Sequence, residues 1–230
     1  MIKAILFDFN GVIINDEPLQ MKIYQNILRG EGIEVTEADY YASLGMDDRR
    51  FVEAAFERGE KDLTDETINR LLETKDAMYR KETEGELPLF PGVVNFVKQL
   101  SHHYRLGIVS MSRRAEINAV LQRADLAGYF EGIVSTEDVT ACKPDPQCYN
   151  AGFRVLDEIH TVKAKFPLVR EQVLAIEDSP PGVQAAKSAG LKVLGVTNTV
   201  SAERLREAGA DVVTKNLADW IPETIELVFQ

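Results

Sequence analysis

The chain has 230 residues, of which 45% are hydrophobic, so it has room for a large α/β domain or for a core domain with a smaller one. Its 37 acidic residues outnumber its 26 basic ones, and the formal charge of -11 argues against a nucleic-acid polymer as a partner. No apolar run approaches the roughly 20 residues of a membrane span, no secretory signal pattern opens the chain, and its two cysteines form no metal or redox motif. We therefore expect a cytoplasmic protein without a membrane partner that is a monomer or a weak homodimer.

The chain begins with a nearly continuous apolar run, Ile2 to Phe7, that ends in Asp8. Such a run is typical of a strand buried on both faces of a parallel sheet, and its carboxyl end opens into the crevice where such sheets bind ligands. Asp8 and Asn10 alternate with two phenylalanines, so both polar side chains would point the same way. Gly11 then permits a sharp turn that leaves main-chain groups free. The same pattern also suits a plain turn that closes a strand, so the rest of the chain must decide.

A helical module is predicted directly after this strand. Asn15 or Asp16 can cap its first helix, which is expected to end near residue 30. No strand pattern follows before residue 87, and the next six residues contain two prolines, which favours a linker back to the core. The other helices are predicted at Ala38–Leu44, Arg49–Arg58 and Asp65–Lys81. The predicted domains are a core of residues 1–14 and 88–230 and a helical domain of residues 15–87.

From Val93 onward, strand and helix patterns alternate, which is typical of a parallel sheet with helices on both faces. The predicted fold class is therefore α/β, with a Rossmann-like parallel-sheet core and an inserted α-helical domain. The segment from Asp157 to Glu171 has mixed charge and is expected to be an exposed extension. Strands are predicted at Arg105–Ser110, Gly132–Ser135, Val173–Glu177, Lys192–Val196 and Asp211–Val213, and helices at Arg114–Ala124, Pro146–Ile159, Pro181–Ala189, Ala202–Ala208 and Leu217–Phe229.

Polar side chains follow three more of these strands, as Asp8 follows the first. Ser110 ends one strand, Lys143 lies in the loop after the next, and the pair Glu177-Asp178 ends a third. Because the carboxyl ends of parallel strands meet at one edge of a sheet, these groups should converge there. A hydroxyl, an ammonium group and several carboxylates suit a phosphate together with Mg2+, which prefers oxygen ligands. Each group alone would more often be structural, whereas their joint order favours a site.

These residues resemble the four signature motifs of the haloacid dehalogenase-like (HAD) superfamily. Asp8-Phe9-Asn10-Gly11-Val12 is similar to the first motif, Ser110 to the second, Lys143-Pro144 to the third, and the run from Glu177 to Gly182 to the fourth. The fourth run is especially close to the form found in the β-phosphoglucomutase-like branch, and the helical module resembles that branch's cap. The resemblance covers essentially the whole chain and implies a HAD core with a helical cap.

The resemblance also implies an activity, namely a phosphatase of a small phosphorylated metabolite that works through an aspartyl-phosphate on Asp8. Asn10 would stand at the acid/base position, and Ser110 and Lys143 would hold the phosphoryl oxygens. Mg2+ would be the cofactor, with ligands from Asp8, Asn10 (main-chain carbonyl), Glu177 and Asp178. Contacts to the phosphate and the rest of the substrate would come from Phe9, Asn10, Arg49, Ser110, Met111 and Lys143.

Asn10 is the main departure from the family pattern. Phosphatases and mutases of the superfamily carry a second Asp there, which protonates the leaving group and later activates water, and an amide can do neither. Losing such a group costs on the order of 10²–10⁴ in rate. Gln20 stands where the mutase branch carries a His, which disfavours a phosphoglucomutase-like phosphotransferase. Three alternatives stay open: an enzyme whose leaving group needs little protonation or that finds its proton elsewhere, a binding or regulatory protein with little turnover, and an engineered Asn10 that traps an intermediate.

Overall fold

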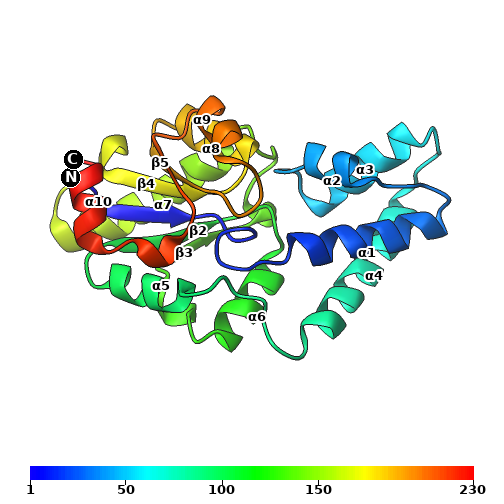
Figure 1. Cartoon of the computed structure of the whole chain (residues 1–230), viewed down its shortest axis with the longest axis horizontal. Helices are drawn as coiled ribbons and strands as arrows, with labels where there is room; N and C mark the ends of the chain where they lie inside the picture. The colour runs from blue at the N-terminus through cyan, green and yellow to red at the C-terminus, as the bar shows by residue number, and fades with distance from the viewer.

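A six-stranded parallel sheet forms the centre of the structure, a computed structural model that describes residues 1–230. The strand order is β3-β2-β1-β4-β5-β6, and Figure 1 shows helices on both sides of the sheet. The predicted α/β fold with a parallel-sheet core is therefore confirmed. The strands are β1 (Ala4–Phe7), β2 (Arg105–Val109), β3 (Gly132–Val134), β4 (Val173–Glu177), β5 (Lys192–Val196) and β6 (Val212–Thr214).

The first strand, β1, lies in the middle of the sheet, paired in parallel with β2 on one side and β4 on the other. Ile5 and Phe7 belong to the hydrophobic cluster on one face, and Ala4 and Leu6 to the cluster on the other. Burial on both faces explains why this stretch is apolar without alternation. Because all three strands run the same way, the residues that follow them emerge at one edge of the sheet.

Two groups of helices cover the two faces. Helices α5, α6 and α10 supply buried residues to the cluster that contains Phe7, and α7, α8 and α9 supply them to the cluster that contains Leu6. No helix of the structure has both the length and the apolar character that crossing a membrane requires. The ranges are α5 (Val93–Ser101), α6 (Arg114–Arg123), α7 (Gln147–Ala164), α8 (Pro180–Ser188), α9 (Ala202–Glu207) and α10 (Pro222–Val228).

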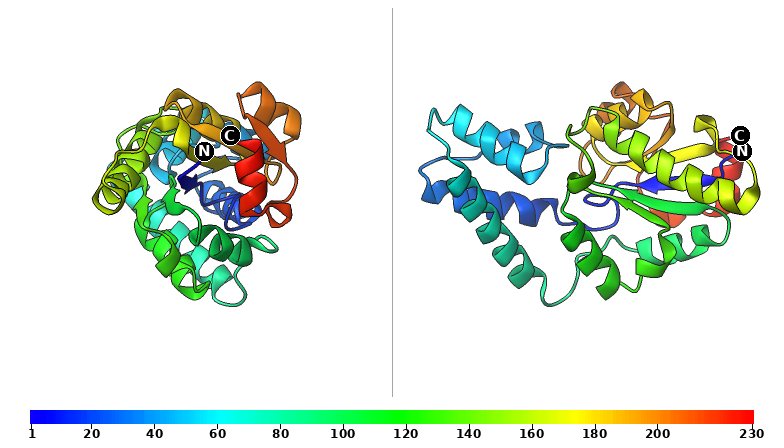
Figure 2. Two further views of the ribbon diagram at one scale, coloured as in Figure 1. Left: turned by 90° about the vertical axis from the view of Figure 1, so that its left-hand side faces the viewer. Right: turned by 180° about the vertical axis from the view of Figure 1, so that it is seen from behind.

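The helical insertion packs around its own core of 14 buried residues. It stands beside the carboxyl edge of the sheet in Figure 1, and both chain ends lie at the opposite end of the molecule, as the two views of Figure 2 also show. Its two connections to the sheet meet at an isolated bridge between Ile14 and Leu89. We propose that residues 15–87 move against residues 1–14 and 88–230 at these connections. The inserted helices are α1 (Glu17–Gly30), α2 (Glu37–Ala42), α3 (Asp48–Arg58) and α4 (Asp65–Thr83).

The C-terminal segment differs from the single helix predicted at Leu217–Phe229. A short 3-10 turn covers Leu217–Asp219, and α10 begins only at Pro222. Proline has no N–H to donate and disfavours a helical conformation in the residue before it, so a helix starts here rather than continuing. Trp220 lies at this break, where it is 8% exposed and packs in the core.

The segment Asp157–Glu171 is also more ordered than the exposed extension that its charges suggested. Helix α7 continues to Ala164, and Lys165 ends it in a left-handed conformation with φ 68°. The Asp157 carboxylate accepts a hydrogen bond of 2.6 Å from the Leu168 N–H, which ties the returning chain to the helix. Part of the prediction holds, because Val162 and Phe166 are largely exposed.

Candidate functional site

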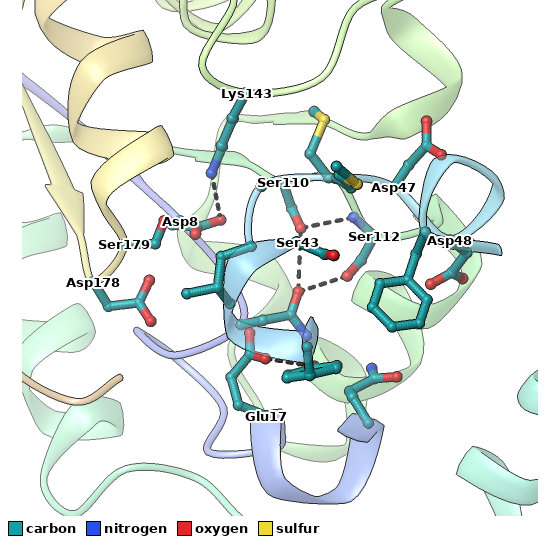
Figure 3. Close-up of a pocket in the computed structure, with 18 of the residues that line it drawn as sticks. Asp8, Glu17, Ser43, Asp47, Asp48, Ser110, Ser112, Lys143, Asp178 and Ser179 are labelled. Atoms are coloured by element: carbon teal, nitrogen blue, oxygen red, sulfur yellow. Dashed lines mark hydrogen bonds and ion pairs between the residues drawn. The ribbon is translucent and has the colours of Figure 1, made fainter. Parts of the chain in front are cut away.

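A cavity of about 90 Å³ lies between the carboxyl edge of the sheet and the helical insertion (Figure 3). Core residues that follow β1, β2 and β4 line one side of it, and residues of α1, α2 and α3 line the other. Small-molecule pockets usually measure roughly 300–1,000 Å³, so this space suits a group about the size of a phosphate. A larger substrate needs the helical insertion to move away before it can enter.

Lys143 is the central cation of the site. It is 5% exposed, and its Nζ lies 3.0 Å from Asp8 Oδ1 and 2.7 Å from Glu177 Oε1. Burial favours the uncharged amine, but the charges of Asp8 and Glu177 outweigh it and raise the pKa of Lys143. Burial, with the charge of Glu177 adding to it, raises the pKa of Asp8 to about 7. Lys143 therefore stays charged and compensates part of the negative charge around it.

Glu177 is completely buried and holds Lys143 in place. Its Oε1 accepts hydrogen bonds of 2.7 Å from Lys143 and from the Tyr149 hydroxyl. Its Oε2 accepts from the Asp178 N–H at 3.1 Å and from the Ser179 hydroxyl at 3.3 Å. Because both oxygens are occupied by donors, we propose that Glu177 acts through Lys143 rather than as a direct ligand of a metal.

A metal fits beside these residues. The ligand oxygens of Asp8, Glu177 and Asp178 lie within 4.8 Å of one another. Burial, followed by the charges of Asp8 and Glu177, raises the pKa of Asp178 well above its ordinary value. Gly11 leaves room for this carboxylate, since a Cβ there would lie 1.8 Å from Asp178 Oδ2. Three carboxylates face one lysine, and the excess negative charge and oxygen donors suit a hard divalent cation such as Mg2+. Asp8, Asp178 and the Asn10 carbonyl, which accepts no hydrogen bond, are free to hold it.

The residues after β2 lie on the opposite side of Asp8. Ser110 is 1% exposed, and its Oγ accepts a hydrogen bond of 3.0 Å from the Ser112 N–H. Ser110 and the buried Met111 both line the cavity, as the resemblance implied, and so does Ser112, which the motif alone did not indicate. Phe9 contributes differently, because its side chain is completely buried in the core and only its N–H reaches the site, donating to Asp8 Oδ1 at 2.8 Å.

The side chain of Asn10 is held by the carboxylate of Asp16, a residue whose sequence pattern predicted a helix cap. Its Nδ2 donates to both oxygens of Asp16, at 3.1 and 2.9 Å, while its Oδ1 accepts from the Ser112 hydroxyl at 2.6 Å. Asp16 occupies the N-cap position of α1, but its side chain makes no capping hydrogen bond and is completely buried. It also accepts from Tyr79 and Gln20. Burial raises the pKa of Asp16, and these hydrogen bonds counter part of the rise.

Glu17, the next residue, lines the cavity itself. The Tyr40 hydroxyl donates to its Oε2 at 2.6 Å, and Oε1 has no hydrogen-bond partner in the chain. Burial, with the charge of Asp16 adding to it, raises the pKa of Glu17 to about 7. Figure 3 shows this carboxylate pointing from α1 toward the side of the cavity that holds Asp8 and Asp178. The sequence pattern indicated only that an acidic residue here favours a helix start.

Arg49 does not line the cavity in this structure, and its predicted contact with the substrate stays a prediction. It follows Asp48, the first residue of α3, and its guanidinium pairs with Glu53 at 3.0 Å and with Asp65 at 2.5 Å on the outer surface. The neighbouring Asp47 and Asp48 line the cavity instead. Successive residues of a helix point about 100° apart, so Asp48 can face the cavity while Arg49 faces solvent.

Comparisons with known proteins identify the family of this chain. A model of the haloacid dehalogenase-like hydrolase family matches residues 5–196. A phosphorylated carbohydrates phosphatase of Thermotoga maritima is 31% identical over 217 residues, which are 93% of this chain and 94% of that protein. Among solved structures, CbbY of Rhodobacter sphaeroides in complex with phosphate has a TM-score of 0.77 at 26% identity and covers 95% of this chain and 96% of its own. A β-phosphoglucomutase of Clostridium difficile has a TM-score of 0.85 at 21% identity, covering 100% of this chain and 97% of its own, and shows the shared fold. On the family match and the Thermotoga relative, this chain belongs to the haloacid dehalogenase-like hydrolase family.

Proposed function

We propose that this chain is a Mg2+-dependent phosphatase of small phosphorylated metabolites that forms an aspartyl-phosphate on Asp8. The observation that carries the proposal is the buried arrangement of Asp8, Lys143 and Asp178 at the edge of the sheet, facing a cavity the size of a phosphate. A lone structural ion pair would not need a third buried carboxylate beside it, because that carboxylate costs free energy unless a cation compensates it.

Asp8 is positioned for attack on phosphorus. Its Oδ1 is fixed by the Phe9 N–H and by Lys143, whereas its Oδ2 accepts no hydrogen bond from the chain and is free to act as the nucleophile. Lys143 reduces the repulsion between this carboxylate and an anionic phosphate, and the Ser110 hydroxyl lies beside the same space. When bound, Mg2+ would neutralise charge on the phosphoryl oxygens.

Phosphorylated carbohydrates are the substrate class that we favour. The Thermotoga relative is named for this class, and a relative in Streptomyces hygroscopicus, 24% identical over 220 residues, is a validoxylamine A 7'-phosphate phosphatase. The cap side of the cavity offers hydrogen-bonding groups for hydroxyls, namely Ser43, Asp47 and Asp48. A phosphoglycolate phosphatase of Yersinia pseudotuberculosis, 23% identical over 224 residues, makes small phosphorylated acids the next class to test.

The test is phosphate release from a panel of sugar phosphates, phosphoglycolate, nucleotides and acyl phosphates, with Mg2+ and with EDTA. We expect turnover that requires Mg2+ and that disappears in Asp8→Asn, since an amide cannot attack phosphorus. Trapping with acid should recover a covalent phosphoryl group from the wild-type protein and none from Asp8→Asn. Tight binding of these compounds without turnover would instead favour a binding or regulatory protein, and glucose phosphate isomerisation would favour the mutase alternative.

A further inference from the structure

Five carboxylates line the cavity, and four of them are already engaged. Asp8 and Asp178 belong to the group at the sheet edge that suits the nucleophile and the metal. Both oxygens of Asp47 accept hydrogen bonds, one from the first turn of α3 and the other from two side chains of the core. Both oxygens of Asp48 are also bonded, one to the Tyr24 hydroxyl and the other to the buried ammonium group of Lys75 at 3.0 Å. None of these four is free to exchange a proton with a substrate.

Glu17 is the fifth carboxylate, and its contacts differ. Its one hydrogen-bond partner, the Tyr40 hydroxyl, is neutral, and the second oxygen is unoccupied. Asn10, which would carry the proton in a family member with Asp there, is drawn toward Asp16 at the start of the same helix. The side chain of Glu17 therefore comes from the residue directly after the one that anchors Asn10, and it points into the cavity (Figure 3).

We propose that Glu17 is the general acid and base of this enzyme, in place of the carboxylate that position 10 lacks. This proposal rests on the phosphatase function proposed above. A carboxyl group whose pKa lies near neutrality can serve in both directions, and the pKa of Glu17, raised to about 7 by burial and by the charge of Asp16, has this property. Because Glu17 belongs to the helical insertion, the proton donor would reach the substrate only when the insertion is closed over the core.

The two chemical steps balance with this assignment. In the first, Asp8 Oδ2 attacks phosphorus, the bond from phosphorus to the ester oxygen breaks, and protonated Glu17 gives its proton to that oxygen, which leaves as an alcohol. In the second, water attacks the phosphorus of the aspartyl-phosphate, ionised Glu17 takes a proton from this water, and the bond from phosphorus to Asp8 breaks. Inorganic phosphate leaves, Asp8 is ionised and Glu17 is protonated again, as at the start.

The test compares Glu17→Gln with the wild-type protein on an alkyl phosphate and on acetyl phosphate. An alkoxide needs a proton in order to leave, so kcat/KM for the alkyl phosphate should fall about 10²–10⁴-fold. A carboxylate leaves unaided, so kcat/KM for acetyl phosphate should fall less than about 10-fold. The second step loses its base with either substrate, and the acid-trapped phosphoryl-enzyme formed from acetyl phosphate should therefore rise toward one equivalent.

Three further variants make the test specific. Glu37→Gln removes an exposed carboxylate from the first turn of α2 and should leave kcat/KM unchanged for both substrates. Glu17→Asp keeps the carboxylate but withdraws it, and should retain more alkyl-phosphate activity than Glu17→Gln. Asp16→Asn removes the buried carboxylate beside Asn10. If kcat/KM falls only for alkyl phosphates in this variant, while Glu17→Gln still hydrolyses them, the proton comes from Asp16 and the proposal is overturned.

The remaining outcomes separate this proposal from the proposed function. A Glu17→Gln protein that hydrolyses alkyl phosphates within about threefold of an active wild type overturns the role of Glu17 and leaves the phosphatase intact. An equal loss with both substrates, without accumulation of the phosphoryl-enzyme, would make Glu17 a structural residue and also overturn it. A wild type that releases phosphate from no substrate would overturn the phosphatase function, and the role of Glu17 with it.

Discussion

The two sides of the cavity hold buried carboxylates in different ways. At the edge of the sheet, Asp8 and Glu177 contact the ammonium group of Lys143. At the start of α1, Asp16 and Glu17 accept hydrogen bonds only from neutral groups, which are amides and tyrosine hydroxyls. Asp16 is as buried as Glu177 and Glu17 is half-buried, but only the first group has a cation in direct contact.

This difference separates two kinds of work. Lys143 offsets part of the effect of burial on the pKa of Asp8, and a bound metal would favour the ionised carboxylate further, which suits a nucleophile and an electrostatic clamp. A carboxylate among neutral donors keeps a raised pKa and is suited to carry a proton. The sheet edge with Asp8 and Lys143, the core side of the cavity, can therefore bind and attack a phosphate. The start of α1 with Asp16 and Glu17, the cap side, can protonate a leaving group. Five predictions test this comparison.

The largest effect is expected from Lys143→Met, which removes the cation from the core side. Uncompensated carboxylates then remain buried, and breaking a buried ion pair in this way costs about 3–5 kcal/mol of unfolding free energy. Activity should fall about 10²–10³-fold or more, because the phosphate loses a preorganised positive charge. Urea unfolding without Mg2+ and kcat/KM measure the two effects. The matched control is Lys163→Met, whose exposed pair with Glu131 should contribute no more than about 1 kcal/mol.

Mg2+ should stabilise the protein more as the pH rises. The pKa of Asp8 is raised from 3.8 to about 7, so the folded protein without metal binds more protons than the unfolded chain and loses stability between these values as the pH increases. Mg2+ binds the ionised carboxylates and recovers this loss, by roughly 2.7 kcal/mol at about 100 times its Kd. Thermal unfolding at pH 5 and pH 8, with and without Mg2+, measures the stabilisation by Mg2+ at each pH. Asp178→Ala should abolish the Mg2+ effect, and a shift independent of pH would contradict the assignment.

The pair of Asn10 and Asp16 should behave as one unit. Asn10→Asp alone places two carboxylates about 3 Å apart, where they repel unless they share a proton, and we expect a loss of about 1–3 kcal/mol in stability. Adding Asp16→Asn restores a hydrogen-bonded amide and carboxylate with their positions exchanged, so most of the loss should be recovered. A double-mutant cycle in urea measures the coupling, and additive effects of the two substitutions would show that the contact does not matter.

The same exchange tests where the proton comes from. We expect Asn10→Asp with Asp16→Asn, introduced into Glu17→Gln, to restore kcat/KM for alkyl phosphates by about 10-fold or more and to change that for acyl phosphates much less, because only the alkoxide needs a proton to leave. An equal change for both substrates would show that position 10 does not supply a proton even when it carries a carboxylate.

The smallest effect is expected from Arg49→Ala. Its side chain is 49% exposed and pairs with Glu53 and Asp65 outside the cavity. Exposed pairs contribute about 0–1 kcal/mol, so stability should change little and KM should change less than about twofold. Steady-state kinetics on the best substrate of the panel checks this, and a rise in KM of tenfold would mean that Arg49 turns inward when substrate binds.

The core side of the site followed from the sequence. A buried parallel strand is apolar on both faces, and its end is marked where a polar residue interrupts the run, as at Asp8, Ser110 and Glu177. Parallel strands place their carboxyl ends at one edge, so the sequence order of these residues was enough to predict that they meet. The Asn10 departure could also be read directly, because it occupies one position in a fixed motif.

The cap side was decided by the tertiary structure. Asp16 had the sequence pattern of a helix cap, yet it faces Asn10, and Arg49 had the pattern of a loop that contacts substrate, yet it faces solvent. Local periodicity fixes which residues of a helix share a face, but not how the helix is rotated against another part of the chain. That rotation depends on packing between segments distant in sequence, and it alone places Glu17 in the cavity that Asp8 also lines.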